Sequence, residues 1–167
     1  MAEVLHLFKS LARGEPVREF SEVWAIENKG FQGCLHGRRE SSRQVLLMDI
    51  ETLEEFGVVP GSVKENITTR GIALAGLAKG QYLRAGEALL EVTKPCTPCY
   101  QMDEIRNGLQ EAIRGRRGIL CRVVASGKIC CGDQVGIVEQ APNELRTRAP
   151  FLNSGTASGA RNRGATE

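Results

Sequence analysis

Short apolar runs separated by glycine-containing turns dominate this sequence and limit the folds that it can adopt. These runs predict strands at residues 23–26, 44–50, 81–83, 88–93, 119–125, 128–131 and 134–138. The runs do not alternate with helical segments, which argues against a Rossmann or thioredoxin topology. The pattern therefore predicts a mainly β fold of the α+β class, in which the strands form a partly closed barrel.

One segment has the apolar spacing of a substantial helix. Residues 100–114 place apolar side chains three to four positions apart, at Met102, Ile105, Leu109 and Ile113. One or two helical turns are expected at residues 52–56, and the apolar residues at positions 4–11 suggest a short amphipathic helix. The fold prediction is thus a β structure with one main helix.

Length and charge limit the organisation of the chain and the classes of partner. We expect one domain over residues 1–140, followed by a flexible, disordered tail at residues 141–167 with almost no apolar content. A net charge of +2 does not favour nucleic acid, and the longest apolar runs are too short to span a membrane. Charged residues interrupt the N-terminal apolar stretch, so no secretory signal is expected, and the six cysteines predict free thiols in the cytoplasm.

Two cysteines lie in a proline-rich turn between a predicted strand and the predicted helix, in the segment LLEVTKPCTPCY at residues 89–100. Pro95 and Pro98 fix their own φ angles and favour extended geometry in the residues before them. Cys96 and Cys99 therefore belong to a stiff turn near a helix N-terminus, where N–H groups and the helix dipole stabilise a thiolate. Cys99 is the strongest candidate for a reactive residue.

Five segments form a pattern when they are taken together. They are HG at 36–37, SRQVLLMD at 42–49, KENITTRGIAL at 64–74, KGQYLRAGEALLEVTKPCTPC at 79–99 and GRRGILCRVVASGKICCGDQVGIV at 115–138. In order and spacing they resemble the MOSC domain, a family named for the C-terminal domain of molybdenum-cofactor sulfurases. The resemblance covers residues 20–140.

The resemblance implies a β-barrel-like domain associated with the molybdenum cofactor, a pterin dithiolene that carries a phosphate. The family cysteine is thought to bind the metal or to carry sulfur as a persulfide, and it corresponds to Cys99. Some members reduce N-hydroxylated compounds. This chain departs from the family in having a second thiol, Cys96, and in a rewritten basic segment, HGRRESSRQV, whose basic position is Arg43. Pyridoxal phosphate is expected only on a separate cysteine desulfurase partner.

The residue types suit this chemistry. Thiolate sulfur is a soft ligand for molybdenum, and guanidinium groups bind phosphate in a bidentate manner. The candidate cofactor-binding residues are Arg43, Asn66, Thr68, Thr69, Cys96 and Arg116. Further arginines that the sequence does not rank are Arg38, Arg39, Arg70, Arg117 and Arg122. His36 is a second candidate catalytic residue, since its charge changes readily near neutral pH.

Functions from different classes remain open. The first is a protein that binds molybdenum cofactor or carries sulfur on Cys99. It would reduce N-hydroxylated compounds with a separate electron donor, or supply a molybdoenzyme. The alternative is a thiol–disulfide redox protein that uses Cys96 and Cys99. A zinc site that adds Cys130 and Cys131 to these thiols is less favoured, because adjacent strand residues point to opposite faces.

Overall fold

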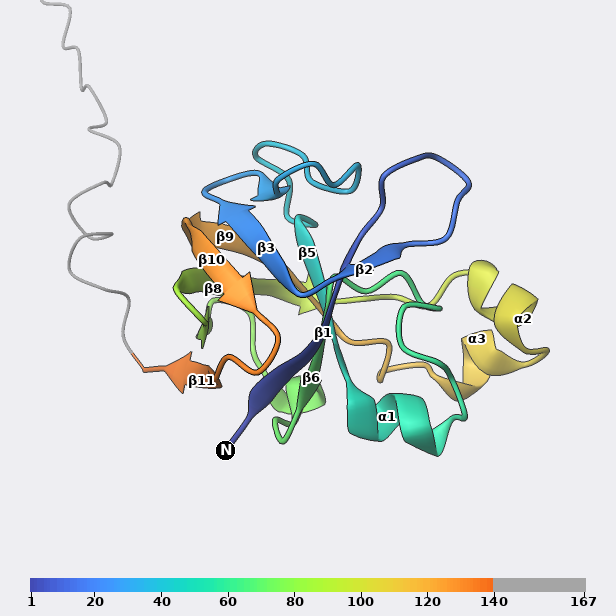
Figure 1. Cartoon of the computed structure of the whole chain (residues 1–167). Coiled ribbons are helices and arrows are strands. Elements are labelled where there is room, and N and C mark those ends of the chain that lie inside the picture. The colour runs from blue at the N-terminus through green and yellow to red at the C-terminus, as the bar shows by residue number, and fades with distance from the viewer. Residues whose placement is uncertain (140–167) are drawn as a thin grey trace, which may run out of the picture.

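The computed structural model describes residues 1–139 and arranges their strands in two sheets (Figure 1). The larger sheet has eight strands in the order β11-β7-β8-β9-β5-β6-β1-β2. Their bounds are β1 (Glu3–Lys9), β2 (Arg18–Phe20), β5 (Val45–Asp49), β6 (Ile67–Arg70), β7 (Tyr82–Ala85), β8 (Ala88–Pro95), β9 (Ile119–Ala125) and β11 (Val135–Val138). The smaller sheet has the order β10-β3-β4, with β10 (Gly127–Cys130), β3 (Glu22–Ile26) and β4 (Gly30–Phe31). The tail predicted at residues 141–167 lies outside the described residues.

The mainly β prediction is confirmed, with 39% strand and 13% helix, but the predicted barrel is not. Only β5 and β6 pair in parallel within the described sheets, and the other pairs are antiparallel. The large sheet stays open, with β11 and β2 at its ends. The Val4 N–H donates to the Asp133 carbonyl, but the adjoining contact is an isolated bridge between Glu3 and Gln134 and does not extend into a strand pairing.

Strand β5 lies inside the large sheet and is buried on both faces, as the sequence predicts. Val45 and Leu47 pack into the main core, which contains residues of both sheets. Met48 packs with the helical segments, and Leu46 packs beside Cys96. Because successive strand residues point to opposite faces, this one strand joins the main core to the helical side of the molecule.

The helical side contains three short helices, α1 (Ile50–Glu55), α2 (Gln101–Ile105) and α3 (Leu109–Ala112), and η1 (Leu74–Gly76) is a separate 3-10 turn. The prediction of one long helix over residues 100–114 is wrong. The chain is extended at Arg106 and left-handed at Gly108, where φ is 83° and glycine avoids the strain of a Cβ. The predicted apolar positions Met102 and Leu109 are nevertheless buried in the cluster formed with α1.

The N-terminal segment is a strand, so the predicted amphipathic helix at residues 4–11 is wrong. Strand β1 pairs on one side with β2 and on the other with β6. Its apolar residues Val4, Leu7 and Phe8 are buried. Pairing on both edges satisfies the backbone hydrogen-bonding groups of β1, and this tertiary gain overrides the local helical spacing.

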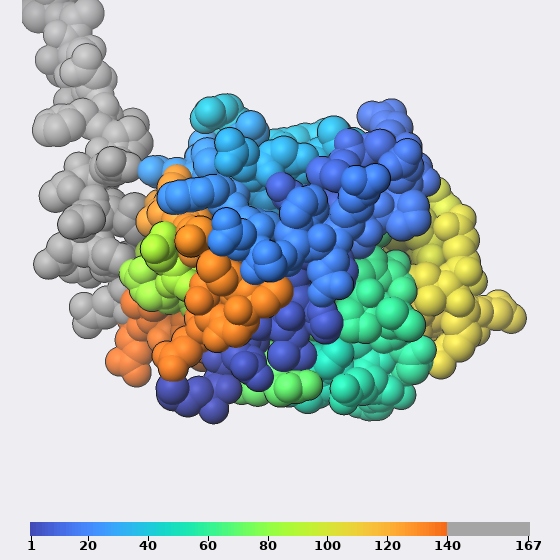
Figure 2. Space-filling view, in the orientation of Figure 1, coloured from blue at the N-terminus to red at the C-terminus, as the bar shows by residue number. Residues whose placement is uncertain are grey.

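The three helices gather on one side of the molecule, and β10 and β11 lie on the opposite side (Figure 1). In the space-filling view the segments that precede and follow β3 cover the upper face, and the region of α2 and α3 forms one edge (Figure 2). No helix among the described residues has the length and apolar character needed to cross a membrane.

Candidate functional site

A cavity of about 470 Å³ lies beside the cysteine turn. Both thiols of that turn, Cys96 and Cys99, line it. Its basic lining residues are Arg38, Arg43, Lys64 and Arg117, and His36 and Asn66 also face it. None of the described residues lining it is an aspartate or a glutamate. The cavity is therefore a basic pocket that contains two thiols, which suits an anionic ligand with an affinity for soft sulfur donors.

The cysteine turn is held by backbone contacts to two neighbouring segments. The Cys96 N–H donates to the Gly118 carbonyl at 3.0 Å, and the side-chain amide of Gln110 donates to the Pro98 carbonyl at 3.4 Å. Pro98 is buried, which fixes the turn between β8 and α2. This turn presents Cys99, which is partly exposed, whereas Cys96 is only 6% exposed.

Cys96 packs against Leu46 of β5 and Leu120 of β9 in a small apolar cluster. The two thiols therefore have different environments, although both reach the cavity. The helix that follows has five residues, so its dipole is a weaker support for a thiolate than the predicted fifteen-residue helix. The positively charged groups that share the cavity with Cys99 are its basic lining side chains.

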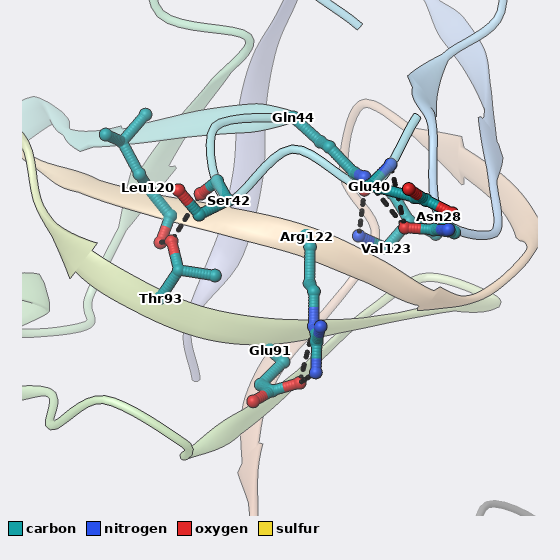
Figure 3. Close-up of polar contacts among 9 residues, drawn as sticks. All are labelled: Asn28, Glu40, Ser42, Gln44, Glu91, Thr93, Leu120, Arg122 and Val123. Carbon is teal, nitrogen blue, oxygen red and sulfur yellow. Dashed lines mark hydrogen bonds and ion pairs between the residues drawn. The ribbon is translucent and has the colours of Figure 1, made fainter. Parts of the chain in front are cut away.

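The buried side-chain amide of Gln44 ties the loop that carries Arg38 to the sheets, and Figure 3 shows its contacts with Asn28 and Val123. Its Nε2 donates to the Arg38 carbonyl at 3.2 Å and to Asn28 Oδ1 at 3.3 Å. Its Oε1 accepts from the Val123 N–H at 3.0 Å. One side chain therefore joins the rim loop, the loop after β3, and β9.

Thr93 of β8 makes the second attachment of this loop (Figure 3). Its hydroxyl contacts the carbonyls of Ser42 and Leu120. The Ser42 contact lies directly before Arg43, so it limits the movement of that cavity residue. The same view shows Arg122 pointing away to pair with Glu91 at 2.6 Å, and Arg122 does not line the cavity.

Replacing Gln44 by Leu is expected to lower the free energy of unfolding by about 1–3 kcal/mol, because it removes the described partner of the buried Val123 N–H. Leucine has a similar size, so the loss comes from the hydrogen bonds. Arg122→Gln is the matched control, since exposed ion pairs contribute about 0–1 kcal/mol. Urea unfolding of both variants measures the difference. Equal losses would show that the Gln44 network does not hold the rim.

Asn66 faces the cavity, but its amide is occupied by the backbone. Its Oδ1 accepts from the Leu46 N–H at 3.0 Å, and its Nδ2 donates to the Phe8 carbonyl at 3.2 Å. Thr68 and Thr69 do not line the cavity, and they bond to Glu65 and to the Met48 carbonyl. Within the predicted ENITT segment, Asn66 alone reaches the cavity, where it also holds β1 and β5 together.

Arg116 lies outside the cavity, on the helical side. It forms an ion pair with Glu55 at 2.7 Å and stacks over the Phe56 ring at 5.3 Å from its centre. Its neighbour Arg117 lines the cavity. Both arginines stand in the GRRG segment at 115–118, and nothing in the sequence distinguishes them. The direction of the backbone before β9 places Arg117 at the cavity and Arg116 on the helical side.

Arg117 and Glu65 are buried polar residues with unsatisfied atoms. Arg117 is 7% exposed, and its Nη2 donates to the Val63 carbonyl at 2.7 Å, whereas Nε and Nη1 have no partner. Glu65 Oε1 accepts from the Gly61 N–H at 2.6 Å and from the Thr68 hydroxyl at 3.0 Å, and its Oε2 has no partner. Unpaired buried polar atoms cost about 1–3 kcal/mol each, so this region is less stable than its packing implies.

Burial raises the pKa of Glu65, although its hydrogen bonds and the charge of Arg117 act against this. The folded state therefore holds the Glu65 proton more tightly than the unfolded chain. This contribution to stability is fully present below the unfolded pKa and is lost as the pH rises through the folded pKa. We expect Glu65→Gln to gain stability relative to the unmodified protein as the pH rises from 4.5 toward neutrality. Unfolding at a series of pH values measures the difference, and a difference independent of pH would contradict it.

His36 is placed in a positively charged environment. Partial burial lowers its pKa, and the charges of Lys64 and Arg38 lower it further. The imidazole is therefore neutral at neutral pH, with one ring nitrogen able to donate and the other able to accept. The chemistry that this supports is hydrogen bonding or proton transfer at the cavity wall.

The remaining cysteines do not line the cavity, and all six thiols are free. Cys121 is fully buried in the main core, where burial raises the pKa of its thiol. Cys130 lies near Glu22, and Cys131 near the Phe20 carbonyl. Across residues 1–139 no group of three or more His, Cys, Asp or Glu side chains is arranged to hold a metal ion. Cys130 and Cys131, which the zinc hypothesis would add to the turn cysteines, do not line the cavity that Cys96 and Cys99 share.

Comparison with known families agrees with the arrangement of strands and cysteine turn. The family model for the MOSC domain matches residues 40–136, more than half of the chain. The chain belongs to the MOSC domain family. The matched MOSC segment includes Arg43, Lys64, Cys96, Cys99 and Arg117, and it excludes His36 and Arg38. Part of the cavity rim therefore comes from residues before the matched segment.

Two curated relatives resemble this MOSC protein over part of their length. A reductase from Gibberella moniliformis is 32% identical over 85 residues, which are 48% of this chain and 15% of the reductase. The protein YiiM from Escherichia coli is 32% identical over 90 residues, which are 50% of this chain and 36% of YiiM. The chain thus matches well under two thirds of either relative.

Solved structures show the same fold. The YuaD protein from Bacillus subtilis superposes with a TM-score of 0.70 at 19% identity, over 82% of this chain and 96% of that one. YiiM from Geobacillus stearothermophilus gives a TM-score of 0.60 at 21% identity, over 83% of this chain and 73% of that one. At these identities the likeness concerns the architecture of the MOSC domain.

Proposed function

We propose that this MOSC domain binds the molybdenum cofactor in the cavity beside the cysteine turn, with the Cys99 sulfur as a ligand of the metal. One observation carries the proposal. A partly exposed thiol shares a cavity with four basic side chains, and no carboxylate of the described residues lines that cavity. The soft sulfur donor suits molybdenum, and the basic groups suit the phosphate of the pterin.

The residues of the chain fit this cofactor in their donor types. Arg117 has two buried nitrogens without partners, which a bound anionic group would satisfy. Neutral His36 can give or take a proton at the wall of the cavity. The Gln44 and Thr93 contacts hold the rim in one position, so that less conformational entropy is lost when the ligand binds.

The activity that we propose for the loaded protein is reduction of N-hydroxylated compounds, with electrons from a separate donor protein. When bound, the cofactor would supply a metal centre able to exchange a pair of electrons with the substrate. The chain itself would hold the cofactor through Cys99 and the basic residues, and would supply protons through groups such as His36. A relative named as a reductase supports this class of activity.

The test is the molybdenum and pterin content of the protein purified from a host that makes the cofactor. We expect stoichiometric molybdenum and the fluorescence of an oxidised pterin. Protein made in a cofactor-deficient host is the control and should lack both. Folded protein that carries neither component from the competent host would contradict the proposal.

A second candidate is supported by the position of both turn cysteines at one cavity. Cys96 and Cys99 would then exchange between dithiol and disulfide, or Cys99 would carry a persulfide delivered by a separate pyridoxal-phosphate desulfurase. Alkylation at defined glutathione potentials, followed by mass measurement, distinguishes these reactions. A disulfide protects both thiols from alkylation, whereas a persulfide adds about 32 Da to the Cys99 peptide. Fully reduced thiols at all cytosolic potentials would remove the disulfide reaction.

A further inference from the structure

Arg117 differs from the other basic residues of the cavity because it is buried and only partly paired. Its single described hydrogen bond is to the Val63 carbonyl at 2.7 Å, and its Nε and Nη1 have no partner. Across residues 1–139 its guanidinium takes part in no ion pair. A buried charge of this kind is unfavourable unless a further group completes its hydrogen bonds.

The surroundings of Arg117 favour an anion as that further group. Its bond to Val63 connects it to the loop in which Lys64 lines the same cavity. Lys64 has a φ of 62°, an uncommon left-handed conformation for a residue with a side chain. Arg117 therefore bonds to the residue directly before this strained, charged one.

The charged side chains at the rim also favour an anion in the cavity. Lys64 and Arg38 both lower the pKa of His36, which indicates that their fields overlap within the cavity. The buried carboxylate of Glu65 is engaged by Gly61 and Thr68 through its Oε1. Because burial also raises the pKa of Glu65, that carboxylate offsets the charge of Arg117 less completely.

We propose that Arg117 is the anchor for a phosphate monoester group of the ligand, with Lys64 as the second contact. A planar guanidinium offers parallel N–H donors that match phosphate oxygens, and an ammonium group adds a point charge. The inference deepens the proposed function and rests on it for the identity of the whole ligand. The free nitrogens of Arg117 have almost no exposed surface, so binding includes a small movement of the guanidinium or of the loop at 61–66.

Inorganic phosphate is the probe, and NMR of the unmodified protein without cofactor is the first measurement. We expect phosphate to shift the Arg117 Nε–H resonance and to raise the pKa of His36, because a negative charge in the cavity favours the imidazolium. The chain has two histidines, and His6 lies outside the cavity beside Glu19, so its ring resonances should not respond to phosphate. An unchanged Arg117 resonance at saturating phosphate would overturn the proposal.

Variants give a second, independent measurement. Arg117→Gln should weaken phosphate binding by about tenfold or more, since hydrogen bonds to charged groups are among the strongest in proteins. Arg117→Lys should recover part of the affinity, and the matched control Arg116→Gln should leave it unchanged, because Arg116 pairs with Glu55 outside the cavity. Equal phosphate affinity in Arg117→Gln and Arg116→Gln would overturn the proposal.

The outcomes separate this inference from the proposed function. Phosphate bound at Arg117 in a protein that never acquires molybdenum would support the anchor and contradict the cofactor. Molybdenum retained at full level by Arg117→Gln, with unchanged phosphate affinity, would contradict the anchor and leave the cofactor.

Discussion

Replacing Cys99 by Ala is expected to reduce the molybdenum content of the purified protein by at least about tenfold. Even residues that only orient metal ligands typically contribute 10- to 100-fold to metal affinity, so loss of a direct sulfur ligand should have no smaller effect. Cys99 is partly exposed at the cavity, and the described hydrogen bond of its thiol is a weak one, from Sγ to Gln101 Oε1 at 3.8 Å. The substitution should therefore remove the sulfur with little loss of stability.

Cys131→Ala is the matched control, because this exposed thiol lies near β2 and outside the cavity. It should retain the molybdenum of the unmodified protein. The molybdenum-to-pterin ratio of each variant, measured together with its unfolding midpoint, distinguishes loss of a ligand from loss of the fold. Full molybdenum in a folded Cys99→Ala protein would show that Cys99 is not a ligand.

The Cys96→Ser variant tests the competing thiol–disulfide hypothesis. If Cys99 binds the metal, this variant should keep most of the molybdenum, although the buried cluster with Leu46 and Leu120 becomes less favourable. If the two cysteines act as a redox pair, either substitution should abolish the reversible oxidised form. Parallel measurement of metal content and thiol oxidation in both variants separates the two functions.

Of the substitutions considered, Gly118→Ala is expected to lower the free energy of unfolding the most, by about 3–5 kcal/mol. This loss combines backbone strain with overpacking. Gly118 has a φ of 80°, and a Cβ at this position would stand 2.1 Å from the Leu47 carbonyl oxygen. The obstructing atom belongs to the backbone of β5 and cannot turn away. The Gly118 carbonyl also accepts from the Cys96 N–H, so the strain would reach the cysteine turn.

Gly115→Ala is the control for the backbone term alone. Gly115 has a similar φ of 78°, but a Cβ there would meet no atom within 4 Å. The free energy of unfolding of Gly115→Ala should fall by only about 1–3 kcal/mol, the range for an ordinary residue held in a left-handed conformation. Chemical unfolding of the two variants separates steric conflict from strain. Losses of equal size would show that close packing against β5 does not restrict position 118.

Much of the local structure can be predicted from this sequence because it depends on neighbouring residues. Residues 119–125 form β9 as predicted, and residues 44–50 contain β5, buried on both faces. The two prolines identify the cysteine turn, and Cys99 reaches a cavity. The helix prediction fails at Gly108, where the spacing of apolar residues continues through a break of the helix. The same apolar spacing at the N-terminus belongs to β1, which is stabilised by two neighbouring strands.

The sequence by itself determined the mainly β class, the positions of β3, β5 and β7–β11, and the membership of the MOSC family, because periodicity, glycine turns and motif spacing are local properties. The tertiary structure decided which residues meet. Arg117 lines the cavity and Arg116 pairs with Glu55, although the two arginines are adjacent in one segment. The hydroxyl groups of Thr68 and Thr69 bond to Glu65 and to the Met48 carbonyl instead of lining the cavity. The physical reason is that the direction of a side chain depends on the strand register and the close approach of chains, which arise only when distant segments pack together.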